Sequence, residues 1–103
     1  MTDKDLYGGL IRLHILHHAA EGPVFGAGFS DELRHHRYKI SAGTLYPMLH
    51  GMEKKGYLKS HEERTGRRAR RVYEITRKGR VQLAAARDKV RELFGELIEE
   101  RMG

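Results

Sequence analysis

The spacing of apolar residues changes twice along this chain of 103 residues, and the order of those changes limits the folds open to it. Three stretches carry apolar residues at the three- and four-residue steps of an α-helix. Two short strand-like stretches around a glycine turn follow, and helical spacing then returns up to the C-terminus. The sequence therefore predicts a mostly α-helical α+β domain with one hairpin.

The first two helices are predicted from apolar stripes and their stop signals. Residues 3–20 form the first helix, which ends at Gly22-Pro23 because proline cannot continue a helix. Gly26-Ala27-Gly28 is expected to be a flexible joint. A short second helix follows around residues 30–37, with Leu33 pointing inward.

The third helix is predicted over residues 42–55, with Ser41 as its cap. Pro47 lies inside it and removes one backbone hydrogen bond. We therefore expect a loosened first turn, or a break before Tyr46.

The hairpin and the last helix complete the pattern. Residues 58–63 and 70–75 are predicted strands, and residues 65–69 form the glycine-containing turn between them. Thr76 is expected to cap a last helix over residues 77–101.

Three helices followed by a two-stranded wing are typical of a winged helix-turn-helix domain, whose recognition helix would be residues 42–55. Residues 1–76 are predicted to be this DNA-binding domain, and residues 77–103 a C-terminal dimerisation helix.

The apolar seam of so long a C-terminal helix has no partner in a small domain, so a second copy of the chain is expected to cover it. Two such domains on a two-fold axis would read a near-palindromic site. The alternative is a helix folded back on its own domain. The predicted dimer contacts are Leu6, Leu10, Leu83, Val90, Leu93, Phe94, Leu97 and Ile98.

Basic charge is concentrated in the middle of the chain. The net charge is +6, yet the segment from Arg34 to Arg80 holds 14 Lys or Arg against 4 Asp or Glu. Such a field favours a polyanion partner, and double-stranded DNA fits better than an anionic membrane surface. A solvated basic face without a partner is the alternative.

The hairpin carries the densest part of this charge. Neighbouring guanidinium groups repel one another and bind phosphate through paired hydrogen bonds. The outward stripe of the recognition helix adds polar donors, and its N-terminus attracts anions. For Tyr46 the alternative is a half-packed position at the edge of the core. The predicted DNA-binding residues are Ser41, Thr44, Tyr46, His50 and Lys54 of the helix and Lys59, Arg64, Arg67, Arg68 and Arg70 of the hairpin.

Histidines form a second candidate site. His14, His17 and His18 lie at i, i+3 and i+4 of the first helix, and an i,i+4 pair of histidines can bind one divalent metal ion. A metal-responsive regulator is therefore an alternative function. Because few carboxylates lie nearby in the sequence, the favoured interpretation is three histidines that only titrate near neutral pH. No cofactor is predicted.

Catalytic and membrane functions are not expected. The chain has no cysteine, which excludes a disulfide framework and a cysteine-based zinc finger and is typical of a reducing, intracellular setting. No nucleophile elbow, phosphate loop or apolar pair of carboxylates occurs. No apolar run approaches the length of about 20 residues that spans a membrane.

Two motifs carry a resemblance to a known family. Residues 40–50, ISAGTLYPMLH, together with residues 52–58, resemble the recognition-helix signature of PadR-like transcriptional regulators. Residues 66–79 resemble the wing of the same family. The resemblance covers residues 8–100, and the single helix at the C-terminus is similar to the short subfamily.

The resemblance implies a cytoplasmic bacterial repressor that binds operator DNA as a homodimer and releases it on sensing a ligand. By position, it implies operator contacts from Ser41, Thr44, Tyr46, His50, Arg67, Arg68 and Arg70. The chain departs from the family in a polar first hairpin strand and in the absence of tryptophan, on which some short members stack flat aromatic drugs. A winged-helix module whose basic hairpin binds an acidic protein is the alternative from another functional class.

Overall fold

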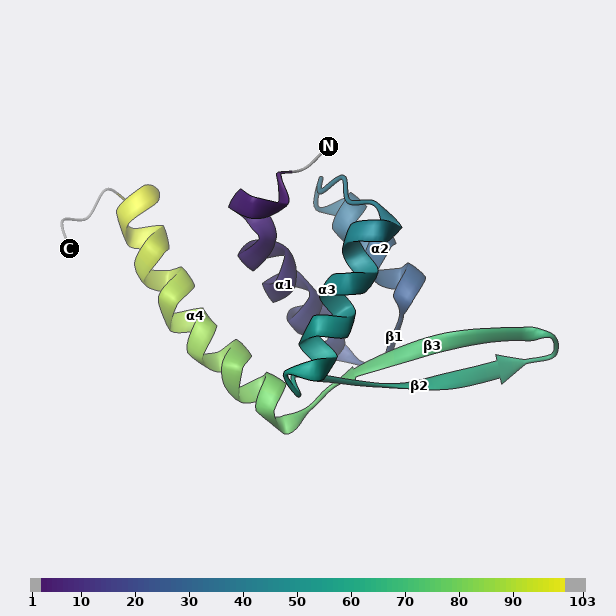
Figure 1. Ribbon diagram of the computed structural model, residues 1–103. Helices are drawn as coiled ribbons and strands as arrows, with labels where there is room; N and C mark the ends of the chain where they lie inside the picture. The colour runs from purple at the N-terminus through teal and green to yellow at the C-terminus, as the bar shows by residue number, and fades with distance from the viewer. Residues whose placement is uncertain (1–2, 100–103) are drawn as a thin grey trace.

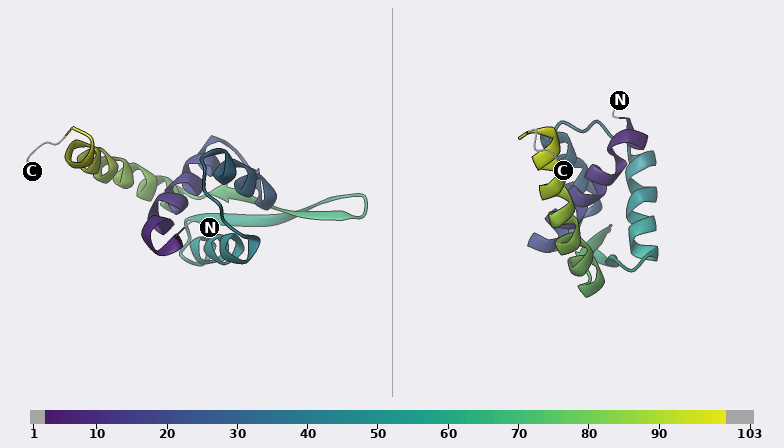
Figure 2. Two further views of the ribbon diagram at one scale, coloured as in Figure 1. Left: turned by 90° about the horizontal axis from the view of Figure 1, so that it is seen from above. Right: turned by 90° about the vertical axis from the view of Figure 1, so that its left-hand side faces the viewer.

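The computed structural model describes residues 3–99. Along the chain lie α1 (Lys4–Glu21), β1 (Val24–Phe25), α2 (Gly26–His35), α3 (Ala42–Lys54), β2 (Leu58–Thr65), β3 (Arg68–Ile75) and α4 (Arg77–Leu97). The β2–β3 hairpin projects from one side of the helical body, and α4 diverges from the other side (Figure 1; Figure 2, left). The predicted winged helix-turn-helix fold with a long C-terminal helix is confirmed.

Helix ends are set by local caps. At the start of α1 the Asp3 carboxylate accepts hydrogen bonds from the backbone amides of Asp5 and Leu6, at 3.0 and 3.2 Å. The Thr76 hydroxyl caps α4 as predicted, because it accepts a hydrogen bond from the Gly79 amide at 3.0 Å. The last helix ends at Leu97, earlier than predicted, and residues 100–103 lie outside the described part of the chain.

The sheet has three strands, so the prediction of a two-stranded wing was incomplete. The strand order is β1-β3-β2, and both pairings are antiparallel. Val24 of β1 lies opposite Tyr73 of β3. A strand of two residues carries no alternating pattern of its own, and its partner lies far along the chain. The glycine turn between β2 and β3 is confirmed, with Gly66 at a φ of +64° that favours glycine.

The predicted flexible joint at Gly26-Ala27-Gly28 was wrong, because these residues begin α2. The two glycines serve close approach instead. A Cβ on Gly26 would lie 2.8 Å from Cε1 of Tyr46, and one on Gly28 would lie 3.0 Å from Cγ1 of Val24. The absence of side chains at these positions lets α2 pack tightly against its neighbours.

The recognition helix α3 is continuous through Pro47, so the alternative of a break before Tyr46 is not observed. Ser41 occupies the cap position, but its side chain makes no capping hydrogen bond. The buried residues Leu45, Leu49 and Met52 lie at helical spacing and hold α3 to the core in spite of the missing backbone bond.

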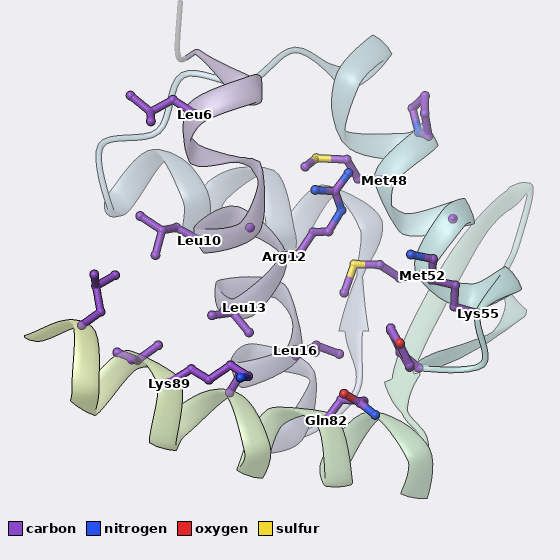
Figure 3. A pocket seen from close by; sticks show the side chains of 17 residues that line it. Leu6, Leu10, Arg12, Leu13, Leu16, Met48, Met52, Lys55, Gln82 and Lys89 are labelled. Carbon is purple, nitrogen blue, oxygen red and sulfur yellow. The ribbon is translucent and has the colours of Figure 1, made fainter. Parts of the chain in front are cut away.

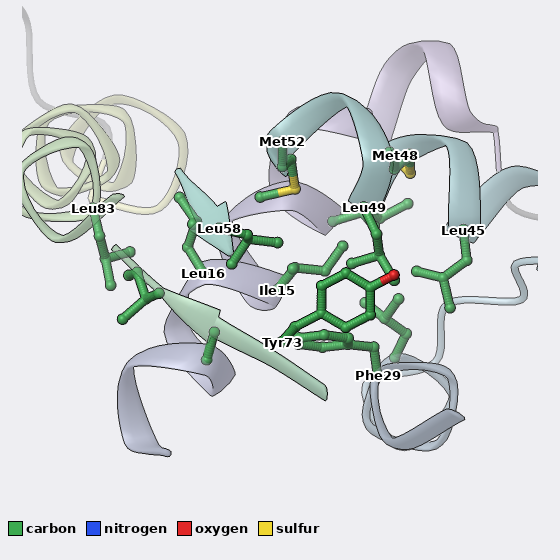
Figure 4. Packing of buried hydrophobic residues seen from close by; sticks show 14 residues of the cluster. Ile15, Leu16, Phe29, Leu45, Met48, Leu49, Met52, Leu58, Tyr73 and Leu83 are labelled. Atoms are coloured by element: carbon green, nitrogen blue, oxygen red, sulfur yellow. The ribbon is translucent and has the colours of Figure 1, made fainter. Parts of the chain in front are cut away.

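The core lies between α1, α2, α3 and the base of the hairpin (Figure 4). The Phe29 and Tyr73 rings meet edge to face, with their centroids 5.9 Å apart. The largest fully buried side chains are Phe29, Ile11, Ile15, Leu33, Leu45, Leu49 and Leu58. Among residues 3–99, no helix has both the length and the apolar character needed to cross a bilayer.

Gly79 holds the start of α4 against the loop that follows α3. A Cβ at this position would collide with the backbone carbonyl of Tyr57 and lie 2.8 Å from Cγ1 of Ile75. Because backbone cannot move aside cheaply, Gly79→Ala is expected to lower the free energy of unfolding by about 2–4 kcal/mol. Urea denaturation followed by circular dichroism measures this loss.

Gly51→Ala is the matched control for Gly79→Ala. Gly51 lies inside α3, and a Cβ there would meet no atom of residues 3–99 within 4 Å beyond its own helix backbone. Alanine is the better helix former, so this variant is expected to unfold at equal or slightly higher urea. Equal stability of the two variants would contradict the packing role of Gly79.

Candidate nucleic-acid interface

One face of α3 is polar and exposed, opposite the buried face that packs on the core. Ser41, Tyr46, His50 and Lys54, all predicted to bind DNA, are exposed, whereas Thr44 is half-buried. The structure therefore leaves the predicted stripe of the recognition helix accessible to a partner.

The N-terminus of α3 is arranged to attract an anion. The Ser41 hydroxyl donates a hydrogen bond to the Thr44 hydroxyl at 3.2 Å instead of capping a backbone amide. The positive end of the helix dipole is therefore not neutralised by a side-chain cap. Both hydroxyls lie where a phosphate oxygen would approach the helix end.

Tyr46 is partly packed, as one alternative for it predicted, and its DNA contact stays a prediction. Its ring lies against the first residue of α2, where a Cβ on Gly26 would approach Cε1 to 2.8 Å and the phenol oxygen to 3.0 Å. The residue is nevertheless 44% exposed. The phenol thus lies at the surface, beside the N-terminus of α2.

The tip of the hairpin presents two arginines without ion-pair partners among residues 3–99. Arg67 occupies the turn and Arg68 is the first residue of β3, and both are exposed. Other wing arginines have partners. Arg64 Nε lies 3.3 Å from a Glu62 carboxylate oxygen, and the Arg70 guanidinium lies 5.0 Å from the centroid of the Phe25 ring. Among residues 3–99, Arg67 and Arg68 are therefore the wing arginines that make no such contact.

A chain of hydrogen bonds joins the hairpin to α3. The Ser60 hydroxyl on β2 donates to a Glu53 carboxylate oxygen of α3 at 2.7 Å. The same hydroxyl accepts from the Arg71 guanidinium of β3 at 3.0 Å. These links hold the base of the wing beside the recognition helix. These links were not predicted, although the polar first strand was their signal.

The predicted dimer face is largely exposed. Leu6, Leu97 and Ile98 have 68%, 68% and 65% of their surface exposed. Leu10, Val90, Leu93 and Phe94 are also exposed. Leu83 differs from the prediction, because it is only 8% exposed and packs in the core of its own chain. The first part of α4 therefore packs on its own domain, whereas the second part leaves its apolar seam open.

An apolar groove lies between α1, α3 and α4 (Figure 3). It has a volume of about 830 Å³. Leu10, Leu13 and Leu16 of α1 and Met48 and Met52 of α3 line it. Val90 and Leu93 belong to both its lining and the predicted dimer face, so the groove and that face are continuous.

The structure corrects the predicted histidine cluster. Side-chain atoms of His14, His18 and His36 lie within 4.8 Å of one another. His17 is turned away, because consecutive residues of a helix point about 100° apart, and its side chain is 55% exposed. Burial lowers the pKa of His14 below its ordinary value, and the neighbouring His36 lowers it further.

Comparisons with known proteins agree with this architecture. Residues 15–85 match the transcriptional regulator PadR-like family. The chain is 48% identical over 95 residues to the transcriptional regulator Rv3488 of Mycobacterium tuberculosis, covering 92% of this chain and 89% of that protein.

Solved structures show the same fold. A PadR family transcriptional regulator from Eggerthella lenta is 28% identical, with a TM-score of 0.80 over 94% of this chain and 88% of that one. The structure of Bacillus subtilis PadR in complex with operator DNA is 16% identical, with a TM-score of 0.67 over 74% of this chain and 46% of that one. At that identity the second likeness concerns the fold alone.

Proposed function

The chain belongs to the PadR-like family of transcriptional regulators, and from this premise we propose that it binds operator DNA as a homodimer. In this proposal α3 enters the major groove and the tip of the wing contacts the neighbouring backbone or minor groove. A regulator of transcription acts by binding, which agrees with the sequence prediction that the chain is not an enzyme.

The observation that carries the proposal is the pairing of an exposed polar helix with an arginine-rich hairpin held beside it. The Glu53–Ser60–Arg71 links support a fixed distance between these two elements. The unpaired Arg67 and Arg68 at the tip are free to bind phosphate through the paired hydrogen bonds of a guanidinium. A DNA duplex supplies phosphates along the whole span of such a surface.

The exposed seam of α4 supports the homodimer. Six apolar side chains on α1, the second half of α4 and its C-terminal cap are between 42% and 68% exposed: Leu6, Leu10, Leu93, Phe94, Leu97 and Ile98. Apolar surface of this extent on one side of a small domain favours association, and a second copy offers the same apolar surface in return. The division between DNA-binding and dimerisation parts then falls inside α4, after Leu83, instead of at residue 77.

The groove between α1, α3 and α4 supports a small-molecule effector. Its lining is mainly aliphatic, with Arg12, Lys55 and Lys89 adding positive charge. Such a site fits an apolar molecule that carries a polar or anionic group. Because the groove touches both the recognition helix and the dimer face, a molecule bound there would act on operator binding. The proposed regulator is therefore a ligand-responsive repressor.

Selection of duplexes from a random DNA library tests the proposed function. The purified protein is expected to enrich near-palindromic sequences and to bind them at least about 10³-fold more tightly than random DNA. With some six to ten phosphate contacts per dimer, affinity is expected to fall about 10³–10⁵-fold between 50 and 200 mM salt. If no duplex binds more tightly than random DNA, the proposal fails. Binding to an acidic protein then becomes the better interpretation of the basic hairpin.

A further inference from the structure

Three histidines from separate parts of the chain converge on one point. His14 and His18 lie on one face of α1, and His36 follows the end of α2. The His14 and His36 rings are stacked with centroids 4.5 Å apart, and the His18 and His36 centroids are 5.4 Å apart. Nothing in the DNA-binding surface or the apolar groove uses this cluster.

The backbone after α2 is shaped to bring His36 to α1. Arg37 has a φ of +69°, a conformation that residues other than glycine rarely adopt. The amides of Arg37 and Tyr38 donate to the carbonyls of Arg34 and Leu33, both at 2.9 Å. This left-handed turn closes α2 and places His36 over the α1 histidines.

One imidazole nitrogen of His18 has no hydrogen-bond partner within the described part of the chain. Its Nδ1 lies 3.3 Å from a Glu21 carboxylate oxygen, to which a proton on Nδ1 can be donated. Its buried Nε2 makes no hydrogen bond to any of residues 3–99, and the Glu32 carboxylate Oε2 lies 3.5 Å from it. With a proton on Nδ1 alone, a nitrogen lone pair and a carboxylate oxygen face each other, and a proton or a metal ion between them removes the repulsion.

The distance between His18 Nε2 and Glu32 Oε2 fits a metal ion bound to both atoms. Bonds of 2.0–2.1 Å in a tetrahedral zinc site place neighbouring ligand atoms about 3.3 Å apart, close to the 3.5 Å between His18 and Glu32. The three imidazoles need only small side-chain rotations to close from within 4.8 Å, and His36 is exposed and able to move. The Glu21 carboxylate behind His18 would orient its ring, as carboxylates do behind many zinc-bound histidines.

We propose that His14, His18, His36 and Glu32 form a binding site for a divalent transition metal of the zinc class. Three imidazoles and one carboxylate suit zinc and its neighbours, and not magnesium or calcium, which prefer oxygen ligands. The bound ion would link α1 to the second helix of the fold. This proposal concerns metal binding alone and does not depend on DNA binding.

Calorimetry with zinc chloride on untagged protein tests the site. At about pH 7.5, where most imidazoles are neutral, one ion per chain is expected to bind with a dissociation constant of about 1 μM or lower. Cobalt(II) serves as a second probe, because a tetrahedral site with nitrogen ligands gives visible d–d absorption that zinc then abolishes. His36→Gln removes an exposed ligand and is expected to weaken zinc binding at least about 100-fold.

His35→Gln and His17→Gln are the matched controls, since each removes an exposed histidine next to a proposed ligand. Both variants are expected to keep the affinity and the cobalt spectrum of the parent protein. Glu32→Gln is expected to change the cobalt spectrum while leaving the three imidazoles in place. Absence of zinc binding in the parent protein, or equal losses in His17→Gln and His36→Gln, would overturn the proposal.

Discussion

The double variant Leu93→Asp, Leu97→Asp is expected to be monomeric and to bind operator DNA at least about 100-fold more weakly than the parent protein, because linking two binding modules raises avidity by about 10²–10⁴. Both side chains lie on the open seam of α4, with 45% and 68% of their surface exposed. A carboxylate at each position would be buried twice in a symmetric dimer, and burial of unpaired charge is strongly unfavourable. Sedimentation velocity gives the oligomeric state, and fluorescence anisotropy gives the affinity.

Val81→Asp separates loss of the dimer from a general effect of acidic residues on α4. Val81 is 59% exposed and lies two residues before the buried Leu83, on the opposite face of the helix. This variant is expected to remain a dimer with unchanged affinity. A dimer that persists in the Leu93→Asp, Leu97→Asp protein would show that α4 is not the interface.

The double variant Arg67→Ala, Arg68→Ala is expected to weaken binding to every DNA sequence. Each arginine that neutralises a phosphate adds about 0.9 to the salt dependence of log K. The slope of log K against log salt is therefore expected to fall by about two for each protomer bound. Preference for the operator over random DNA is expected to change little, because phosphate contacts carry no base sequence. Anisotropy titrations at several salt concentrations measure both quantities.

Replacement of the same two residues by lysine is the control for charge. Lysine keeps the positive charge but cannot form the paired hydrogen bonds of a guanidinium. The salt slope is expected to stay near that of the parent protein, while affinity falls less than in the alanine variant. An unchanged slope in the alanine variant would show that the tip of the wing does not touch DNA.

Local features of the sequence were the reliable guides to this fold. The helical stripes, the glycine turn at Gly66 and the cap at Thr76 each depend on residues close together in the chain, and the structure contains all three. The short strand β1 depends instead on pairing with β3, about 48 residues further on. Its two residues carry no repeating pattern by which it could be predicted.

The prediction of a flexible joint at Gly26-Ala27-Gly28 was wrong for a related reason. Gly26 and Gly28 suggest flexibility by composition, yet they begin a helix and leave room for Tyr46 and Val24. The neighbour that makes a glycine necessary lies elsewhere in the sequence. Only the folded chain distinguishes a glycine used for close packing from one used for freedom of the backbone.

The candidate sites also differ in how far apart their residues lie in the sequence, and this difference decides which of them could be predicted. The arginine tip is readable because a hairpin places neighbouring residues side by side. The Glu53–Ser60–Arg71 links and the partnership of His36 with His14 and His18 join residues from separate elements. Helical spacing alone suggested His17, which lies next to the cluster in sequence but points elsewhere.

Because Leu83 anchors α4 in the core while its later turns remain open, this helix can act as a stiff lever. From Leu83 to Leu97 it extends about 21 Å, at 1.5 Å per residue. A tilt of about 10° at the anchored end therefore displaces the far end by about 4 Å. In the proposed homodimer that displacement would alter the separation of the paired α3 helices, which operator binding would require to match about 34 Å of duplex between half-sites.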